Sequence, residues 1–116
     1  FEGGYQAIEK MINCGQFFDA VFAANDMMAI GVIECLEKYG KCVPNDVAVV
    51  GFDDIPMAAW HKPSLTTIKQ PVYEVGQVAV RIIVDHITGS NTGCTNQVLK
   101  PELIVRQSSG GKGDLS

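Results

Sequence analysis

The first half of the chain has the alternating periodicities of an α/β protein. Apolar residues spaced by three and four predict a helix over residues 3–13, and a short apolar run predicts a buried strand over residues 18–24. A second helix is predicted over residues 25–40, with polar capping residues at its start and a glycine at its end. The apolar run at residues 47–52 does not alternate, which is typical of a parallel strand covered on both faces. This order of elements predicts a βαβ unit with a right-handed crossover.

The second half of the chain contains one long helix between two extended segments. A short extended segment is predicted over residues 65–70. The helix is predicted over residues 71–89, because valines and isoleucines repeat there at helical spacing. Pro71 can begin it, since the first residue of a helix does not need its N–H. Polar turn residues fill positions 90–97, and residues 98–105 contain a final extended segment. We expect the glycine-rich tail, residues 110–116, to be disordered.

The composition fits one domain that buries a core of its own. The chain has 116 residues, of which 47% are hydrophobic, and its net charge is −4. This excludes a disordered chain and argues against a surface that neutralises nucleic-acid phosphates. No apolar run approaches the roughly 20 residues that span a bilayer, and the first residues do not resemble a signal peptide. Phe1 stands where a methionine would begin a natural chain, so we expect a truncated start.

The cysteines and histidines predict neither a disulfide framework nor a metal site. The four cysteines form no CxxC pair, and one of them, Cys35, lies in the apolar stripe of a predicted helix. We expect reduced thiols, which fits a cytoplasmic protein. Neither His61 nor His86 has the spacing to a cysteine that a zinc site requires.

Polar side chains follow both predicted strands of the βαβ unit. Asn25 and Asp26 follow the first strand, and Asp53 and Asp54 follow the second. Because the carboxyl ends of parallel strands meet at one edge of a sheet, these side chains are candidates for a ligand site. Amides and carboxylates suit neutral hydroxyl groups, such as those of sugars or nucleosides. Two simpler interpretations stay open: a helix N-cap for the first pair and a turn for the second.

Catalytic motifs are absent from the sequence. There is no GxSxG elbow, no phosphate-binding loop and no further acidic residues that would make the aspartates a metal site. Gln70 has the sequence context of a solvated hinge residue. Trp60 and His61 lie in a predicted loop between prolines, where either local packing or a subunit contact would explain them.

Several strings together are highly specific for one family. Residues 22–31 read FAANDMMAIG, residues 43–54 read VPNDVAVVGFDD, and residues 63–71 read PSLTTIKQP. Gly76-Gln77 and ELIVRQSS at residues 102–109 follow in the same order. These strings resemble the LacI/GalR family of bacterial transcription regulators over residues 3–109.

The resemblance implies an α/β fold of the periplasmic-binding-protein-like type I, with a three-layer αβα arrangement, a mostly parallel sheet and two lobes joined by crossovers. The chain would be the C-terminal portion of such an effector domain. Residues 1–64 would belong to the C-terminal lobe, residues 65–97 to a crossover and a helix of the N-terminal lobe, and residues 98–109 to a returning strand.

The resemblance also implies roles for individual residues. Asn25 and Asp53 match family positions that contact effector hydroxyls, and Gln70 matches a hinge-side position that reaches the ligand in related sugar-binding proteins. The helix that begins at Asp26 and the loop around Trp60 contribute to a dimer contact in the family. The implied interface residues are Ile30, Ile33, Glu34, Trp60 and His61. No cofactor or metal is implied.

The function implied is that of a non-enzymatic, cytoplasmic effector domain. It would bind a small molecule, most simply a sugar or nucleoside, form a homodimer, and act on operator DNA through a helix-turn-helix outside this chain. One alternative is a periplasmic sugar-binding protein of an uptake system, which would need a signal peptide upstream. A second alternative, a Rossmann-like enzyme, lacks a phosphate loop and an acid–base pair.

Overall fold

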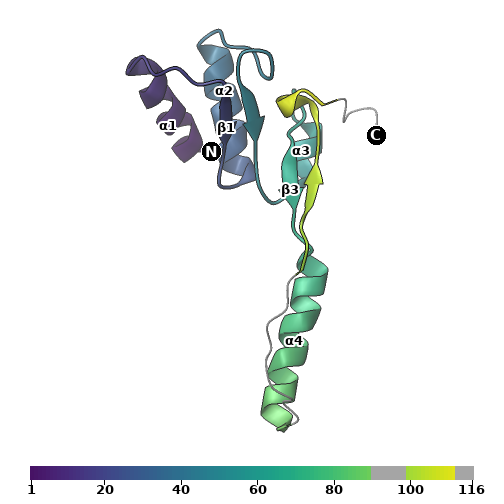
Figure 1. Ribbon diagram of the computed structural model, residues 1–116. Coiled ribbons are helices and arrows are strands. Elements are labelled where there is room, and N and C mark those ends of the chain that lie inside the picture. The colour runs from purple at the N-terminus through teal and green to yellow at the C-terminus, as the bar shows by residue number, and fades with distance from the viewer. Residues whose placement is uncertain (90–98, 112–116) are drawn as a thin grey trace. The chain divides into compact units, whose positions relative to one another are not determined.

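The computed structural model describes residues 1–89 and 99–111 (Figure 1). The elements of this part of the chain are α1 (Glu2–Asn13), β1 (Ala20–Phe22), α2 (Asp26–Lys38), β2 (Ala48–Val50), α3 (Pro56–Trp60), β3 (Thr67–Lys69), α4 (Val72–Thr88), β4 (Glu102–Ile104) and a 3-10 turn (Gln107–Ser109).

The chain divides into two compact units. The larger unit consists of Phe1–Lys69 together with the segment that begins at Leu103, and the smaller unit is Gln70–Glu102. The sequence analysis places its boundaries slightly earlier, at residues 64/65 and 97/98. At the first boundary the difference arises because β3 and the residue before it contact the larger unit: Gly51 N donates to Thr66 O and Asp53 N donates to Ile68 O, both at 2.9 Å.

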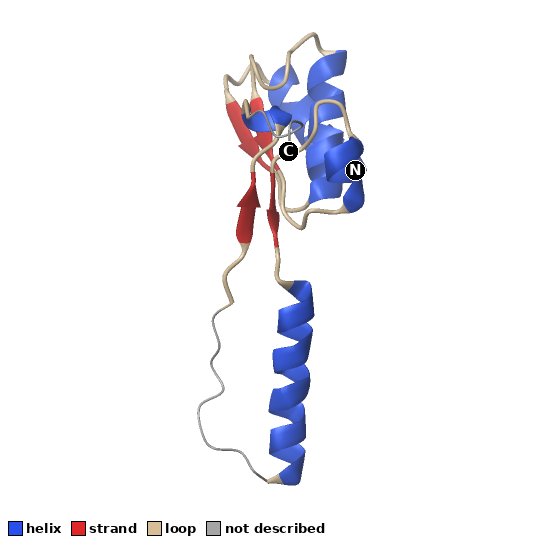
Figure 2. Ribbon diagram, turned by 90° about the vertical axis from the view of Figure 1, so that its right-hand side faces the viewer, coloured by secondary structure: helices blue, strands red, loops and turns tan. Residues whose placement is uncertain are grey.

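The predicted βαβ unit forms the centre of the larger unit. Strands β1 and β2 pair in parallel, with Val21 opposite Val49, and α2 connects them (Figure 2). The fully buried side chains of Ile33, Leu36 and Val49 lie in one apolar core. The prediction of a buried first strand is wrong at its end, because the side chain of Phe22 in β1 is 67% exposed. In β2, Val49 is fully buried, and its neighbours Ala48 and Val50 are partly buried.

Helix α1 packs against α2 through two glycines. A Cβ atom on Gly4 would collide with the carbonyl of Met28, and a Cβ on Gly31 would collide with the carbonyl of Phe1. Both helices can therefore approach to backbone contact only because these positions lack side chains. The approach buries Ile8 of α1 against the core.

The C-terminal segment differs from the prediction in its details. Residues 107–109 form a 3-10 turn, and Ser108 Oγ donates to Val49 O at 2.6 Å, which joins this turn to β2. The predicted disordered tail does not include Gly110 and Gly111, because their amides donate to Gln107 O and Arg106 O at 2.9 Å. Residues 112–116, the remainder of that tail, lie outside the described residues.

The smaller unit contains the predicted helix that follows Pro71. Helix α4 ends at Gly89, which has a φ of 75° and donates to His86 O. A left-handed glycine is a common helix terminator because it has no Cβ to clash. No residue of α4 is buried, although its sequence is rich in valine and isoleucine.

Candidate functional site

The turns that follow β1 and β2 lie side by side. Asp26 N donates to Phe52 O at 3.0 Å, so the start of α2 is bonded directly to the turn that follows β2. This contact brings Asn25 and Asp53 into neighbouring turns at the carboxyl ends of two parallel strands. The geometry agrees with the edge of the sheet at which ligands bind in open α/β folds.

Asp53 and Asp54 both have positive φ angles, of 125° and 58°. This region of backbone conformation favours glycine, so two successive aspartates in it indicate local strain. Asp53 is exposed, and Asp54 is only partly exposed, because its Oδ1 accepts from the Arg106 guanidinium at 2.9 Å. The pair therefore lies in the irregular connection between β2 and α3, and the ligand role of Asp53 stays a prediction.

The side chain of Asn25 caps α2. Its Oδ1 accepts from Met28 N at 2.8 Å, which satisfies one of the free amides at the helix start. The interpretation as an N-cap is confirmed. It does not compete with ligand binding, because the cap uses only the oxygen of the amide and the NH₂ group retains two donors.

Asp26 is fully buried, which its sequence context does not predict. Its side chain is 0% exposed; Oδ2 accepts from Ile55 N at 2.8 Å and Oδ1 accepts from the Thr67 hydroxyl at 2.6 Å. An aspartate in the first turn of a helix is ordinarily read as a solvated charge that complements the helix dipole. The hydrogen-bonding partners lie 29 and 41 residues away, so no local sequence signal reveals them.

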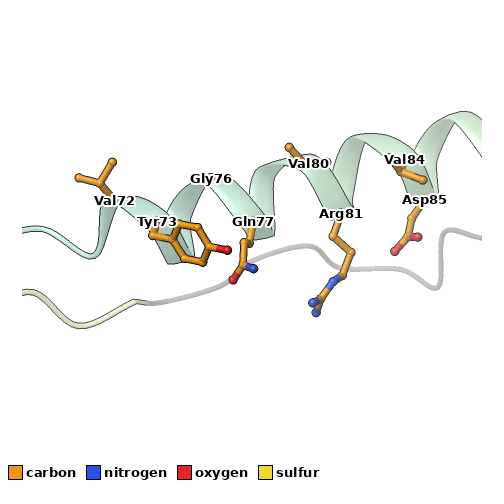
Figure 3. A pocket seen from close by; sticks show the side chains of 8 residues that line it. All are labelled: Val72, Tyr73, Gly76, Gln77, Val80, Arg81, Val84 and Asp85. Carbon is orange, nitrogen blue, oxygen red and sulfur yellow. The ribbon is translucent and has the colours of Figure 1, made fainter.

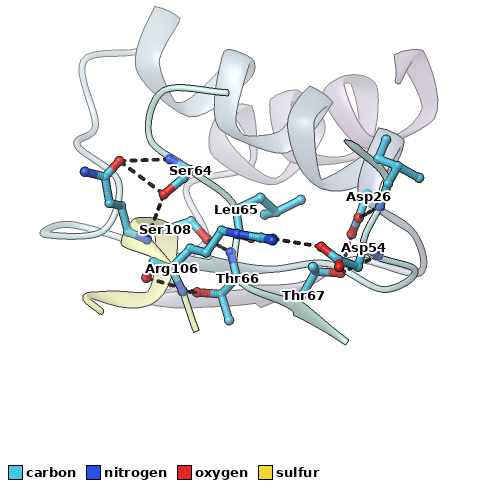
Figure 4. Close-up of polar contacts among 10 residues, drawn as sticks. Asp26, Asp54, Ser64, Leu65, Thr66, Thr67, Arg106 and Ser108 are labelled. Atoms are coloured by element: carbon cyan, nitrogen blue, oxygen red, sulfur yellow. Dashed lines mark hydrogen bonds and ion pairs between the residues drawn. The ribbon is translucent and has the colours of Figure 1, made fainter. Parts of the chain in front are cut away.

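A second group of polar contacts holds the segment before β3 to the C-terminal segment (Figure 4). Arg106 NH1 donates to Leu65 O at 2.9 Å as well as to Asp54. Thr66 N donates to Ser108 Oγ at 2.8 Å, and the Thr66 hydroxyl accepts from Arg106 N at 2.7 Å. These contacts connect Asp54 to the chain that returns after β4, another link that the sequence analysis missed.

Gln70, the third predicted ligand residue, opens the smaller unit. Its carbonyl accepts from Val72 N at 2.8 Å, next to the start of α4. A shallow hollow runs along α4, with Tyr73, Gln77 and Arg81 on its lining (Figure 3). Because all its lining residues come from one helix, the hollow is an exposed helix face rather than an enclosed ligand site.

The residues predicted for an interface fall into two groups. Ile30 and Ile33 are 3% and 0% exposed and belong to the core, so they are unavailable to a partner in this structure. His61 Nε2 lies 3.1 Å from Glu34 Oε1, and His61 Nδ1 lies 3.1 Å from Pro63 O. The neighbouring Trp60 is 74% exposed. Glu34, Trp60 and His61 therefore share one surface region.

The thiols differ strongly in their surroundings. Within the described ranges Cys14, Cys35 and Cys42 are free, and only Cys35 is buried. Burial is the largest influence that raises the pKa of the Cys35 thiol; nearby Glu9 raises it further. Cys94 lies outside the described residues.

In the described part of the chain, no group of three or more histidine, cysteine or acidic side chains is arranged to hold a metal ion. None of the helices described is both long and apolar enough to cross a membrane.

Comparison with known proteins gives consistent matches. The family model of the periplasmic binding protein-like domain matches residues 2–109. The HTH-type transcriptional regulator MalR of Streptomyces coelicolor is 44% identical over 108 residues, which are 93% of this chain and 31% of MalR.

Two solved regulators share the fold. A transcriptional regulator CelR–cellobiose complex matches with a TM-score of 0.86 and 38% identity, over 92% of this chain and 33% of CelR. A Lac repressor dimer bound to operator and the anti-inducer ONPF matches with a TM-score of 0.85 and 34% identity, over 91% of this chain and 32% of the repressor. The chain spans about a third of the length of the curated relatives it matches.

The chain belongs to the periplasmic-binding-protein-like domain family. Its relatives are LacI-type transcription regulators, and the chain corresponds to part of their effector domain. The resemblance to the LacI/GalR family and the predicted α/β fold class are thus confirmed. The relatives named here are regulators and not enzymes.

Proposed function

We propose that this chain is the effector-binding and dimerisation part of a cytoplasmic, non-enzymatic LacI-type regulator, and that Asp53 and Asn25 bind the hydroxyl groups of a sugar-like effector. The observation that carries the proposal is the hydrogen bond from Asp26 N to Phe52 O, at 3.0 Å, which holds the two turns together. The relative CelR was solved with cellobiose, a polyhydroxyl ligand of the kind that the two side chains suit.

The chemistry of the two side chains is complementary. The exposed carboxylate of Asp53 accepts hydrogen bonds from two hydroxyl groups, and the NH₂ group of Asn25 donates to a hydroxyl oxygen. Hydrogen bonds to a charged acceptor are stronger than neutral ones, so Asp53 is the main determinant of affinity. Gln70 belongs to the other unit and stays a prediction from the family resemblance.

Two surfaces have proposed partners. The exposed apolar side chains of α4, which include Val80, Ile83 and Ile87, are proposed to pack on the remainder of an N-terminal lobe. Glu34, Trp60 and His61 are proposed to contact the same surface of a second copy. A dimer of such regulators positions two DNA-binding heads, and effector binding changes their affinity for operator by a coupling free energy of about 1–3 kcal/mol.

Isothermal calorimetry on the full-length gene product tests the ligand proposal. Cellobiose, ribose and cytidine serve as probes, and Asp53→Asn removes the charge while preserving the shape of the side chain. Asp46→Asn is the matched control, because Asp46 is an exposed aspartate in the turn before β2, at the other end of the strand. We expect binding of at least one probe, weakened about 10- to 100-fold by Asp53→Asn and unchanged by Asp46→Asn. Equal affinities of the two variants would contradict the assignment of Asp53.

A further inference from the structure

A buried carboxylate and a buried hydroxyl lie directly behind the Asp53–Asp54 turn. Asp26 and Thr67 are both 0% exposed. The Asp26 carboxylate accepts from Ile55 N at 2.8 Å and from Thr67 Oγ1 at 2.6 Å, while Thr67 Oγ1 also accepts from Asp54 N at 3.2 Å. Two consecutive amides of the turn, those of Asp54 and Ile55, therefore donate hydrogen bonds to Thr67 and Asp26.

The chemistry of the pair fixes the direction of every hydrogen bond. An ionised carboxylate only accepts, so the single proton of the Thr67 hydroxyl must point to Asp26. A lone pair of that hydroxyl is then left for the amide of Asp54. Each donor and acceptor of this group therefore has a fixed role. If the Thr67 hydroxyl proton pointed elsewhere, a buried donor or acceptor would lose its partner.

The Asp26 carboxylate packs closely against the backbone at Gly51. A Cβ atom at this position would collide with Asp26 Oδ1 and would lie 3.1 Å from Leu65 Cδ2. The carboxylate therefore lies against the backbone at Gly51, where its two oxygens are hydrogen-bonded to Ile55 N and to the Thr67 hydroxyl. A rigid support of this kind can hold a backbone conformation that is unfavourable in isolation.

We infer that Asp26 and Thr67 are positioning residues: they hold the Asp53–Asp54 turn in its left-handed conformation and so set the affinity of Asp53 for its ligand without touching that ligand. This inference rests on the proposed function for its ligand, but the support of the turn stands apart from it. The strained φ of Asp53, at 125°, persists because the amides of the next two residues, Asp54 and Ile55, are hydrogen-bonded to Thr67 and Asp26.

The test compares two adjacent threonines in the full-length gene product. Thr67→Val removes the hydroxyl that faces the turn. Thr66→Val is the matched control, because Thr66 is also buried, at 2% exposed, but its hydroxyl bonds to Arg106 and Ser109 instead of the turn. Thr67→Ser keeps the hydroxyl and serves as the conservative rescue. Amide hydrogen exchange at Asp54 and calorimetry with cellobiose, ribose and cytidine are the two measurements.

We expect Thr67→Val to accelerate hydrogen exchange of the Asp54 amide about tenfold. For any probe that binds the unmodified protein, the affinity should fall by about the same factor. Thr66→Val should change both much less, because the Thr66 hydroxyl bonds to the backbone of Arg106 and not to an amide of the turn. Thr67→Ser should restore both. If Thr67→Val does not fold, Asp26→Asn replaces it; an amide there turns one acceptor into a donor, so either the Thr67 hydroxyl or the amide of Ile55 loses its acceptor.

The two proposals fail in distinguishable ways. If no probe binds the unmodified protein but exchange at Asp54 rises only in Thr67→Val, the support of the turn is upheld and the proposed ligand class is wrong. If Thr66→Val and Thr67→Val change exchange at Asp54 and affinity equally, the threonines act on overall stability alone, and the inference is overturned.

Discussion

Replacing Asp53 with glycine should make the protein more stable and abolish its ligand binding. The φ of Asp53 is 125°, in a region that glycine adopts without the steric cost of a Cβ atom. A strained backbone position costs about 1–3 kcal/mol, and a glycine adds about 0.5–1 kcal/mol of unfolded-state entropy. The net expectation is a gain of about 1 kcal/mol in the free energy of unfolding.

Urea denaturation of the full-length gene product, followed by circular dichroism, measures this gain. A higher midpoint with an unchanged slope would report a change of stability and not of compactness. Calorimetry on the same variant with cellobiose, ribose and cytidine measures the loss of binding. A gain of stability together with a loss of binding would show the trade-off between stability and activity that is common at functional sites.

For the neighbouring residue, Asp54, replacement with glycine should have the opposite effect on stability. Asp54 has a φ of 58°, which aspartate tolerates better, and its carboxylate pairs with Arg106 at 2.9 Å. Asp54→Gly should therefore lower stability by about 1–3 kcal/mol, because the largely buried guanidinium of Arg106 loses its ion pair and keeps its hydrogen bond to Leu65 O. The reasoning is refuted if Asp53→Gly is as destabilising as Asp54→Gly, since contacts of the Asp53 side chain would then outweigh the strain of its backbone.

Three further predictions concern packing, pH and assembly. Gly4→Ala should destabilise by about 1–3 kcal/mol, because its methyl group meets the Met28 carbonyl, whereas Gly3→Ala should stabilise by up to about 1 kcal/mol, because nothing lies within 4 Å of it. Stability should fall as the pH rises through and above 9.0, the ordinary pKa of a thiol, because the raised pKa of Cys35 makes the folded state hold a proton that the unfolded state releases. Trp60→Ala should weaken self-association in sedimentation velocity, because an exposed tryptophan of this kind is typical of an interface.

Each of these three predictions has its own control or contradicting result. Equal melting temperatures of the two alanine variants would contradict the close approach of α1 and α2. The alkaline loss of stability should be smaller in Cys35→Ala, so an identical pH profile would remove the thiol as a cause. Replacing Phe17, 90% exposed in the segment between α1 and β1, tests whether any exposed aromatic residue affects assembly in the same way.

The elements that the sequence predicts well are those with strong local patterns. The helices at α1, α2 and α4 have apolar spacing and clear end signals, so their bounds match the prediction closely. Helix α3 was missed because Pro56–Trp60 spans only five residues, too few for a period to show. The interface assignment of Ile30 and Ile33 came from family position, which does not reveal how far a side chain is buried.

The contacts of the candidate site lay mostly beyond sequence reasoning. Asn25 and Asp53 follow apolar runs, and strand order alone placed them at one edge of the sheet. The roles of Asp26 and Arg106 depend on partners between 29 and 52 residues away, which only the folded chain brings together. Buried polar contacts of this kind leave no periodic pattern in the sequence.

A crystal structure of the full-length gene product with whichever probe binds in calorimetry would show directly whether Asp53 and Asn25 bind the effector. We expect a ligand hydroxyl within hydrogen-bond distance of the Asp53 carboxylate and a second at the NH₂ group of Asn25, with Asp53 still in its left-handed conformation. A ligand bound in contact with neither side chain would contradict this expectation.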